Sequence, residues 1–124
     1  MRFVVPRLGS ALIDRQHARI AAEVRVLHAA VKHGRPARAA LGRLIRDTRR
    51  HFATEDRLMR LVGYADEAGH RALHEGVMSE MLRMRALLVA GQSLHPRHAE
   101  QILDWLLHHA AEADRNLVAR LARR

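Results

Sequence analysis

The residues best suited to chemistry in this sequence are His51 and Glu55, which stand four residues apart. In a helix, side chains four residues apart lie on the same face, so this imidazole and this carboxylate point into the same space. The face is otherwise apolar and carries Phe52, Leu58 and Met59. Burying either polar group without a partner costs about 2–7 kcal/mol. A metal ion is the leading candidate for that partner.

Five of the ten histidines fall at helical spacing on faces that are otherwise apolar. They are His17, His51, His70, His74 and His109. A single histidine in such a position is ordinarily a core residue hydrogen-bonded to the backbone. Five of them together with a glutamate favour a metal site. Because the sequence has no cysteine, the ligands must be nitrogen and oxygen, which excludes disulfides, iron–sulfur clusters and thiolate-bound zinc.

Four amphipathic segments are predicted to be the helices that position these side chains. They cover about residues 10–33, 36–62, 67–90 and 95–122, and an extended lead-in covers residues 1–9. Ser10 is a predicted cap, Pro36 a predicted first-turn residue and Gly63 a predicted stop. Short connections predict an all-α, antiparallel up-down-up-down four-helix bundle, with residues 1–124 as one domain.

Each predicted helix carries at least one imidazole near its middle, so an antiparallel bundle brings them to one level of the core. The third helix shows the pattern most clearly. Its predicted buried stripe is His70, Leu73, His74, Val77, Met81, Met84 and Leu88.

The composition is that of an ordinary globular chain, with 48% hydrophobic and 28% charged residues. No apolar run is long enough to span a membrane, and the N-terminus does not read as a secretory signal, so the cytoplasm is the expected location. The formal charge of +9 comes almost wholly from arginines spread along the chain. Their spread, with only four aromatic residues, argues against a nucleic-acid partner.

Four motifs in this sequence resemble those of the hemerythrin and bacteriohemerythrin family. They are residues 13–17 (Ile-Asp-Arg-Gln-His), residues 51–59 with His51, Glu55 and Met59, residues 70–74, and residues 105–117 with Trp105, His109, Asp114 and Leu117. They occur in order and span nearly the whole chain. All seven ligand positions of the family motif are filled, which makes the resemblance specific.

The resemblance implies a non-haem di-iron centre with an oxo or hydroxo bridge. In that arrangement His70, His74 and His109 hold one iron, His17 and His51 hold the other, and Glu55 and Asp114 bridge the two. The three-histidine iron then reaches six ligands, the octahedral complement, whereas the two-histidine iron reaches five. Dioxygen is the expected ligand of the open position, with other small diatomic molecules or anions as alternatives. The expected oxygen pocket consists of Ile20, Phe52, Trp105 and Leu106.

The last motif conflicts with a regular helix. Asp114 lies five residues after His109, which is about 140° around an ideal helix. Glu112 is closer by geometry, but the family pattern selects Asp114. Both Asp114 and His109 reach the metals if the helix is locally irregular, and we predict a π-type turn there. The adjacent His108 is predicted to lie outside the ligand set.

The leading functional hypothesis is reversible oxygen binding, for carriage, storage or sensing. One alternative is a di-iron enzyme that turns over peroxide or nitric oxide at the same centre. Another is a basic interaction protein with a structural metal such as zinc. The open coordination position argues against the last, because structural zinc sites are ordinarily closed.

Overall fold

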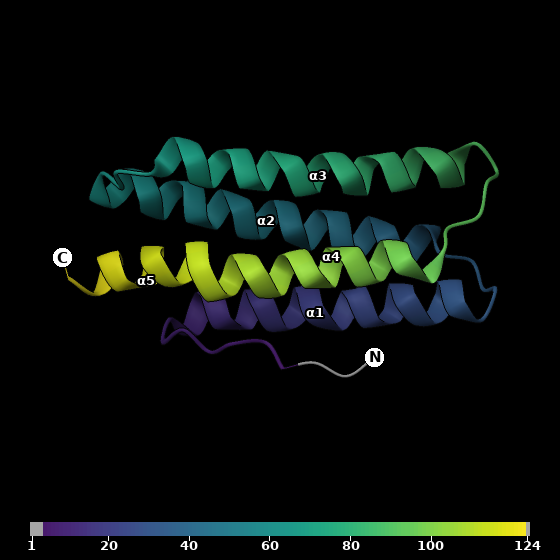
Figure 1. Ribbon diagram of the computed structural model, residues 1–124, viewed down its shortest axis with the longest axis horizontal. Helices are drawn as coiled ribbons and strands as arrows, with labels where there is room; N and C mark the ends of the chain where they lie inside the picture. The colour runs from purple at the N-terminus through teal and green to yellow at the C-terminus, as the bar shows by residue number, and fades with distance from the viewer. Residues whose placement is uncertain (1–3, 124) are drawn as a thin grey trace.

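The computed structural model describes residues 4–123, and these residues form an antiparallel bundle of four rods (Figure 1). The elements are α1 (Ala11–Lys32), α2 (Arg38–Val62), α3 (Glu67–Val89), α4 (Pro96–His109), η1 (Ala110–Asp114) and α5 (Arg115–Ala122). The fourth rod is continuous and consists of α4, η1 and α5 (Figure 1). No strand occurs between residues 4 and 123, so the predicted all-α bundle is confirmed.

The first helix begins where the sequence predicts a cap. The Ser10 hydroxyl accepts a hydrogen bond from the Ile13 amide at 3.4 Å. The Asp14 carboxylate accepts from the amides of Leu8 and Gly9, at 2.8 and 3.2 Å, and so holds the lead-in against the helix. Residues 4–9 are non-helical as predicted, while residues 1–3 of the expected lead-in lie outside the described residues.

The start of α2 differs from the prediction. Pro36 was expected in the first helical turn, but the helix begins at Arg38 with Ala37 as its cap. The Arg35 amide donates a hydrogen bond to the Ala30 carbonyl at 2.8 Å. The chain up to Arg35 is therefore still bonded to the end of α1, and α2 begins only after Pro36. The end of α2 is as predicted, because Gly63 adopts the left-handed conformation with φ of 57° that closes helices.

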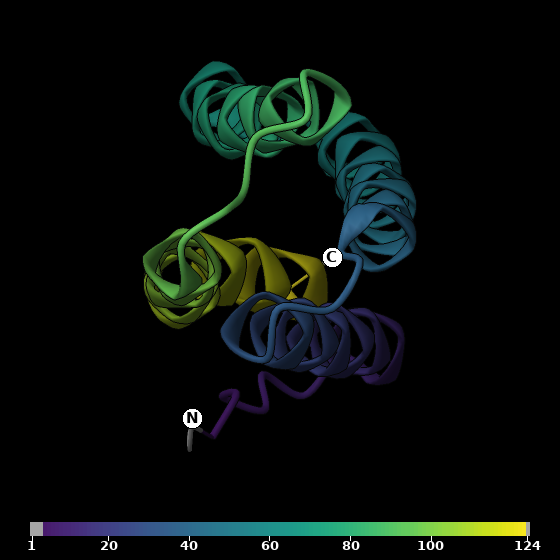
Figure 2. The same ribbon diagram turned by 90° about the vertical axis from the view of Figure 1, so that its right-hand side faces the viewer.

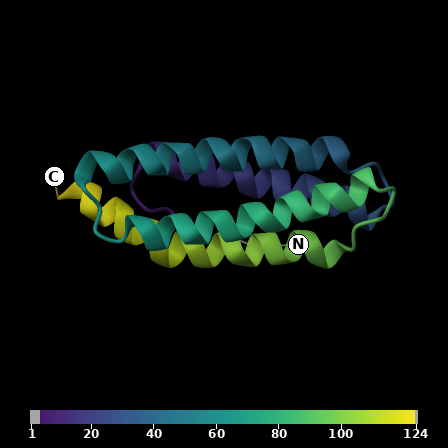
Figure 3. The ribbon, with the colours of Figure 1, turned by 90° about the horizontal axis from the view of Figure 1, so that it is seen from above.

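The apolar stripes meet in one continuous core. Its most deeply buried side chains come from α1 and α2, and include Val24, Leu27, Leu41 and Leu44, all at 0% exposure. Such a core is stabilised mainly by removing apolar surface from water. The four rods are nearly aligned when seen from above (Figure 3). The prediction that each imidazole lies near the middle of its helix is wrong for His17 and His70, which lie near the starts of α1 and α3.

The helices α3 and α4 pack against each other less closely than α1 packs against α2 or α4 (Figure 2). One prediction is wrong for this reason. Leu73 was expected on the buried stripe of α3, but its side chain is 46% exposed, because at this level α3 borders an open groove instead of α4. None of the helices in the described part of the chain is long and apolar enough to cross a membrane.

Candidate metal centre

All seven predicted ligand residues lie together in the core, although they come from every rod of the bundle. His17 comes from α1, His51 and Glu55 from α2, His70 and His74 from α3, His109 from α4 and Asp114 from η1. Each is at most 4% exposed. Burial of this many ionisable groups is costly unless they are paired or bind a metal.

The Glu55 carboxylate lies within reach of four imidazoles. Its Oε1 atom is 3.0 Å from the Nε2 of His74, 3.2 Å from that of His70, 3.3 Å from that of His51 and 3.8 Å from that of His109. The imidazoles therefore turn the same ring nitrogen toward one oxygen, which is the arrangement expected around a shared cation.

Asp114 takes the corresponding position on the opposite rod. Its Oδ2 atom is 2.6 Å from the Nε2 of His17 and 3.6 Å from that of His51. Its Oδ1 atom is 2.6 Å from the Nε2 of His109 and 3.1 Å from that of His70. One carboxylate oxygen thus faces the imidazoles of α1 and α2, and the other faces those of α3 and α4.

The donor atoms divide into two groups that share both carboxylates. Within each group the candidate ligand atoms lie within 4.8 Å of one another. One group is Glu55, His70, His74, His109 and Asp114, and the other is His17, His51, Glu55 and Asp114. The two groups therefore overlap at Glu55 and Asp114.

The local helix geometry that brings Asp114 into the core is a π-helix. The five residues of η1 make a wider turn than an α-helix, so His109 and Asp114 reach the same space despite their five-residue separation. The predicted irregularity is therefore confirmed. Asp114 is 0% exposed, whereas Glu112 and His108 are exposed.

The donor set fits a metal ion on its own geometry. In a six-coordinate site with bonds of about 2.1 Å, neighbouring ligand atoms lie about 3 Å apart. The Nε2 atoms of His74 and His109 are 3.1 Å apart, which matches this spacing between two ligands of one ion. Buried polar atoms without a hydrogen-bond partner include His51 Nε2 and Glu55 Oε2. A cation would satisfy both.

The charges in the cluster stabilise one another. Burial disfavours the charged forms of His51 and His70, but the attraction of the nearby Asp114 and Glu55 carboxylates outweighs it and raises the pKa of each imidazole to about 9. Burial likewise disfavours charge on Glu55 and Asp114, but the surrounding imidazoles hold the pKa of each carboxyl well below its ordinary value. Both carboxyl groups are therefore ionised at neutral pH and available as metal ligands.

Two of the imidazoles are covered by aromatic rings. Phe52 stacks on His74 with ring centroids 3.7 Å apart and planes at 9°. Trp105 stacks on His109 at 4.6 Å and 13°. These contacts fix the orientation of both imidazoles and shield them from water.

A positioning residue that the sequence prediction missed is Gln16. The Nδ1 atom of His51 donates to Gln16 Oε1 at 2.7 Å, and Gln16 Nε2 donates to Thr54 Oγ1 at 3.0 Å. A donor proton on Nδ1 leaves the Nε2 lone pair of His51 free for a metal. The sequence feature that could have indicated this role is the position of Gln16 in the first family motif, directly before His17.

The predicted oxygen-pocket residues line one enclosed cavity beside His51 and His109. Ile20, Phe52, Trp105 and Leu106 all contribute to its wall. Three further wall residues were missed, namely Thr48, Met81 and Ile102. Thr48 and Ile102 could have been found from helical spacing, since each lies three residues before a residue already singled out.

Comparison with known proteins decides the family. The family model described as the hemerythrin HHE cation binding domain matches residues 8–121. The chain belongs to the hemerythrin family. The structure is also similar to the crystal structure of a wild-type hemerythrin. The TM-score is 0.84, and the sequences are 26% identical, with 98% of this chain and 97% of that one covered.

Two curated bacteriohemerythrins are similar to this hemerythrin-family chain. The bacteriohemerythrin of Stenotrophomonas maltophilia (strain R551-3) is 32% identical over 106 residues, covering 82% of this chain and 68% of the relative. That of Pseudomonas aeruginosa (strain LESB58) is 30% identical over 112 residues, covering 89% and 73%. A cation-binding family and a buried cluster of His, Glu and Asp agree that this chain is able to bind metal.

Proposed function

We propose that this hemerythrin-family chain binds dioxygen reversibly at a pair of iron ions. The observation that carries the proposal is the division of the seven donors into two groups that share Glu55 and Asp114. By this assignment His70, His74 and His109 would hold one ion, His17 and His51 would hold the other, and Glu55 and Asp114 would be shared by both. A pair of ferrous ions would supply the electrons and the vacant coordination position that reversible dioxygen binding requires.

The smaller donor group borders the place where a ligand is expected. It has two imidazoles where the other group has three, so its ion has one protein ligand fewer. One of these two imidazoles, His51, also lines the enclosed cavity. Gln16 holds this ring through its Nδ1 atom and so keeps Nε2 directed at the cluster.

The walls of the cavity favour binding over turnover. Apart from the two imidazoles and the hydroxyl of Thr48, the described residues of the wall are apolar, and none carries a carboxylate. A wall of this kind excludes water and offers no acid to deliver protons, which protects a reversible complex from oxidation of the metal. Carriage, storage or sensing in the cytoplasm are uses that fit such a protein.

Anaerobic iron loading followed by an oxygen titration tests the proposal. We expect two irons per chain and a visible absorption band that appears with oxygen and disappears when oxygen is removed. Steady consumption of peroxide or nitric oxide would instead identify an enzyme, and iron or zinc without any oxygen-dependent band would identify a structural metal.

A matched pair of histidine variants ties the result to the cluster. His74→Ala removes a buried donor and should abolish two-iron loading, whereas His108→Ala changes an exposed histidine next to His109 and should leave it intact. If His74→Ala still held two irons per chain, the ligand assignment would be wrong.

A further inference from the structure

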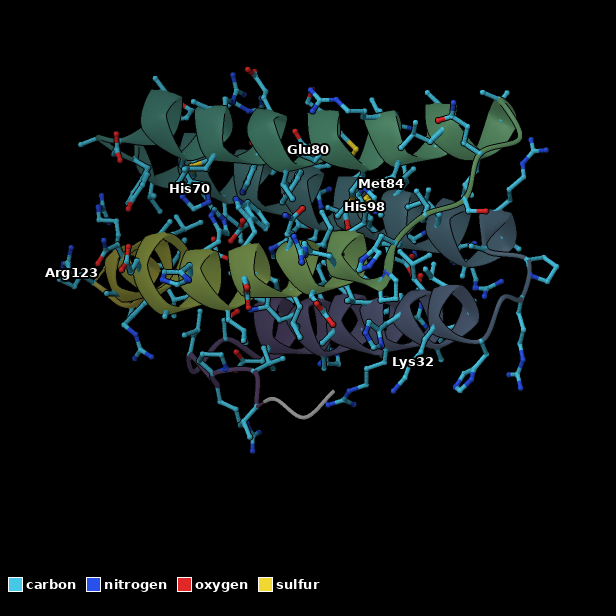
Figure 4. The ribbon with its side chains drawn as sticks, turned by 45° about the vertical axis from the view of Figure 1, so that its right-hand side comes forward. Lys32, His70, Glu80, Met84, His98 and Arg123 are labelled. Atoms are coloured by element: carbon cyan, nitrogen blue, oxygen red, sulfur yellow. The ribbon has the colours of Figure 1, made fainter. Side chains whose placement is uncertain are left out.

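A groove with a volume of about 380 Å³ lies between α3 and α4, on the side where these helices pack least closely. Its wall is mostly apolar and includes Leu73, Gly76, Val77, Ile102 and Trp105. Figure 4 labels Glu80 and Met84 on α3 and His98 on α4, which also line this groove. Leu73 in this groove is a large apolar side chain that is exposed and lies outside the hydrophobic core.

The groove and the enclosed cavity beside the metal centre share a wall. Ile102 and Trp105 line both spaces. On the inner side, Trp105 stacks on His109, and the cavity in this conformation leaves no room for a water-sized molecule. A ligand therefore reaches the cavity only when side chains of the wall move.

A second groove also approaches the cluster, between α2 and α3, but its chemistry is different. Its volume is about 490 Å³, and it is lined by four charged side chains, Arg49, Asp56, Arg71 and Glu75. Phe52 lines both this groove and the cavity, and its ring lies flat against His74 at 3.7 Å. Charged groups hold water, so this groove is a poorer solvent for an apolar gas than the groove between α3 and α4.

We propose that the groove between α3 and α4 is the entrance for small neutral ligands, and that Ile102 and Trp105 form the gate between it and the cavity. The inference rests on the proposed function for the identity of the ligand, a neutral diatomic gas. An apolar molecule loses nothing on leaving water for this groove, whereas an anion or a hydrated ion would lose its solvation. The gate sets the rate of entry and exit and discriminates by polarity.

Gly76→Leu blocks the proposed entrance without touching the metal centre. A Cβ atom built on Gly76 meets nothing within 4 Å, and glycine inside a helix is less favourable than leucine, so the variant should fold. Ala53→Leu is the matched control, because Ala53 is an exposed helical residue that lines the charged groove instead.

In the iron-loaded protein, Gly76→Leu should slow gas association and dissociation by the same factor, about tenfold, which corresponds to a barrier raised by about 1.4 kcal/mol. The dissociation constant should not change, because a plug at the entrance alters the path and not the bound state. Ala53→Leu should leave both rates as they are. Flash photolysis or stopped-flow mixing measures these rates.

The metal-free protein supplies a second readout. Trp105 is the only tryptophan of the chain, so its fluorescence reports on the gate directly. Quenching by dissolved oxygen should fall in Gly76→Leu and stay unchanged in Ala53→Leu, while quenching by iodide should be weak in both. This measurement tests whether oxygen reaches Trp105 through the groove even if the iron-loaded protein binds no gas, in which case only the proposed function fails.

Three outcomes would overturn the proposal. Slower gas binding and weaker oxygen quenching in Ala53→Leu but not in Gly76→Leu would place the entrance between α2 and α3. Unchanged rates and unchanged quenching in both variants would place it elsewhere. A changed dissociation constant in Gly76→Leu with an unchanged association rate would show that the groove affects the bound state and not the path.

Discussion

Replacing Asp114 with asparagine is the sharpest test of the metal centre, because this residue links both donor groups through its two oxygens. Oδ2 is 2.6 Å from His17 Nε2, and Oδ1 is 2.6 Å from His109 Nε2. Asparagine keeps the shape but has one oxygen and no charge. The variant therefore loses one contact, and the negative charge that both groups share.

The size of the effect follows from these contacts. Breaking a buried charge network by removing one partner costs about 3–5 kcal/mol, and the imidazoles can release protons, so about 3 kcal/mol is expected for the metal-free chain. At about 4 °C per kcal/mol for a chain of this length, its melting temperature should fall by about 12 °C.

Metal binding should be affected at least as strongly. A loss of affinity of about 100-fold is at the upper end for residues that only orient a ligand, and a bridging ligand should cost no less. At a free metal concentration 1,000 times the wild-type dissociation constant, binding stabilises the wild type by about 4.1 kcal/mol and the variant by about 1.4 kcal/mol. The corresponding rises in melting temperature are about 16 °C and about 6 °C.

Differential scanning calorimetry with and without metal, together with the iron content per chain, measures both effects. Glu112→Gln is the control, because Glu112 belongs to the same π-helix but its side chain is exposed. Two irons per chain and a wild-type shift in Asp114→Asn, or an equal loss in Glu112→Gln, would refute the assignment of Asp114 as the bridging ligand.

Three further predictions concern the surroundings of the centre. The pKa values of His51 and His70 are raised from 6.5 to about 9 in the folded metal-free chain, so their contribution to the free energy of unfolding is complete below pH 6.5 and disappears as the pH rises to about 9. Metal displaces these protons, so the stabilisation by metal should grow as the pH rises over the same interval. Melting curves of the metal-free and metal-bound chain at pH 6 and pH 9 measure this, and a smaller stabilisation by metal at pH 9 would contradict the prediction. Gln16→Leu removes the acceptor of the His51 Nδ1 proton and should weaken binding of one metal ion about 10–100-fold, and Gln16→Glu should restore it in a metal titration. Thr48→Val removes a buried hydroxyl without a hydrogen-bond partner and should stabilise the metal-free chain by about 1–3 kcal/mol, whereas lower stability in urea unfolding would show that the hydroxyl has a partner.

The helices of this protein were predictable because their signals are local. The caps at Ser10 and Gly63 and the spacing of apolar residues act within a few turns, and the predicted limits agree with the structure to within two residues at most ends. The π-helix was predictable for a different reason. His109 and Asp114 could not share a face of a regular helix, so the family resemblance, which selects both residues, implied the wider turn.

Features that depend on packing between rods were not predictable in this way. The same periodicity that placed His70 and His74 correctly in the core also placed Leu73 there, and the structure exposes it. Periodicity shows which residues share a face of a helix, but not how closely the neighbouring helix approaches that face. The groove between α3 and α4 arises from this difference.

The sequence alone predicted the four helices, the seven candidate donor residues and the turn that brings the last of them inward, through spacing along single helices and, for Asp114, through the resemblance to the hemerythrin family. The tertiary structure alone decided that the two carboxylates serve two groups of imidazoles at once, as in the contact of His17 with Asp114, which are 97 residues apart. It also decided that Gln16 holds His51 across two helices and that an apolar groove reaches the wall of the cavity. These contacts depend on the separation and rotation of whole helices, which the packing of the core sets and no short stretch of sequence specifies.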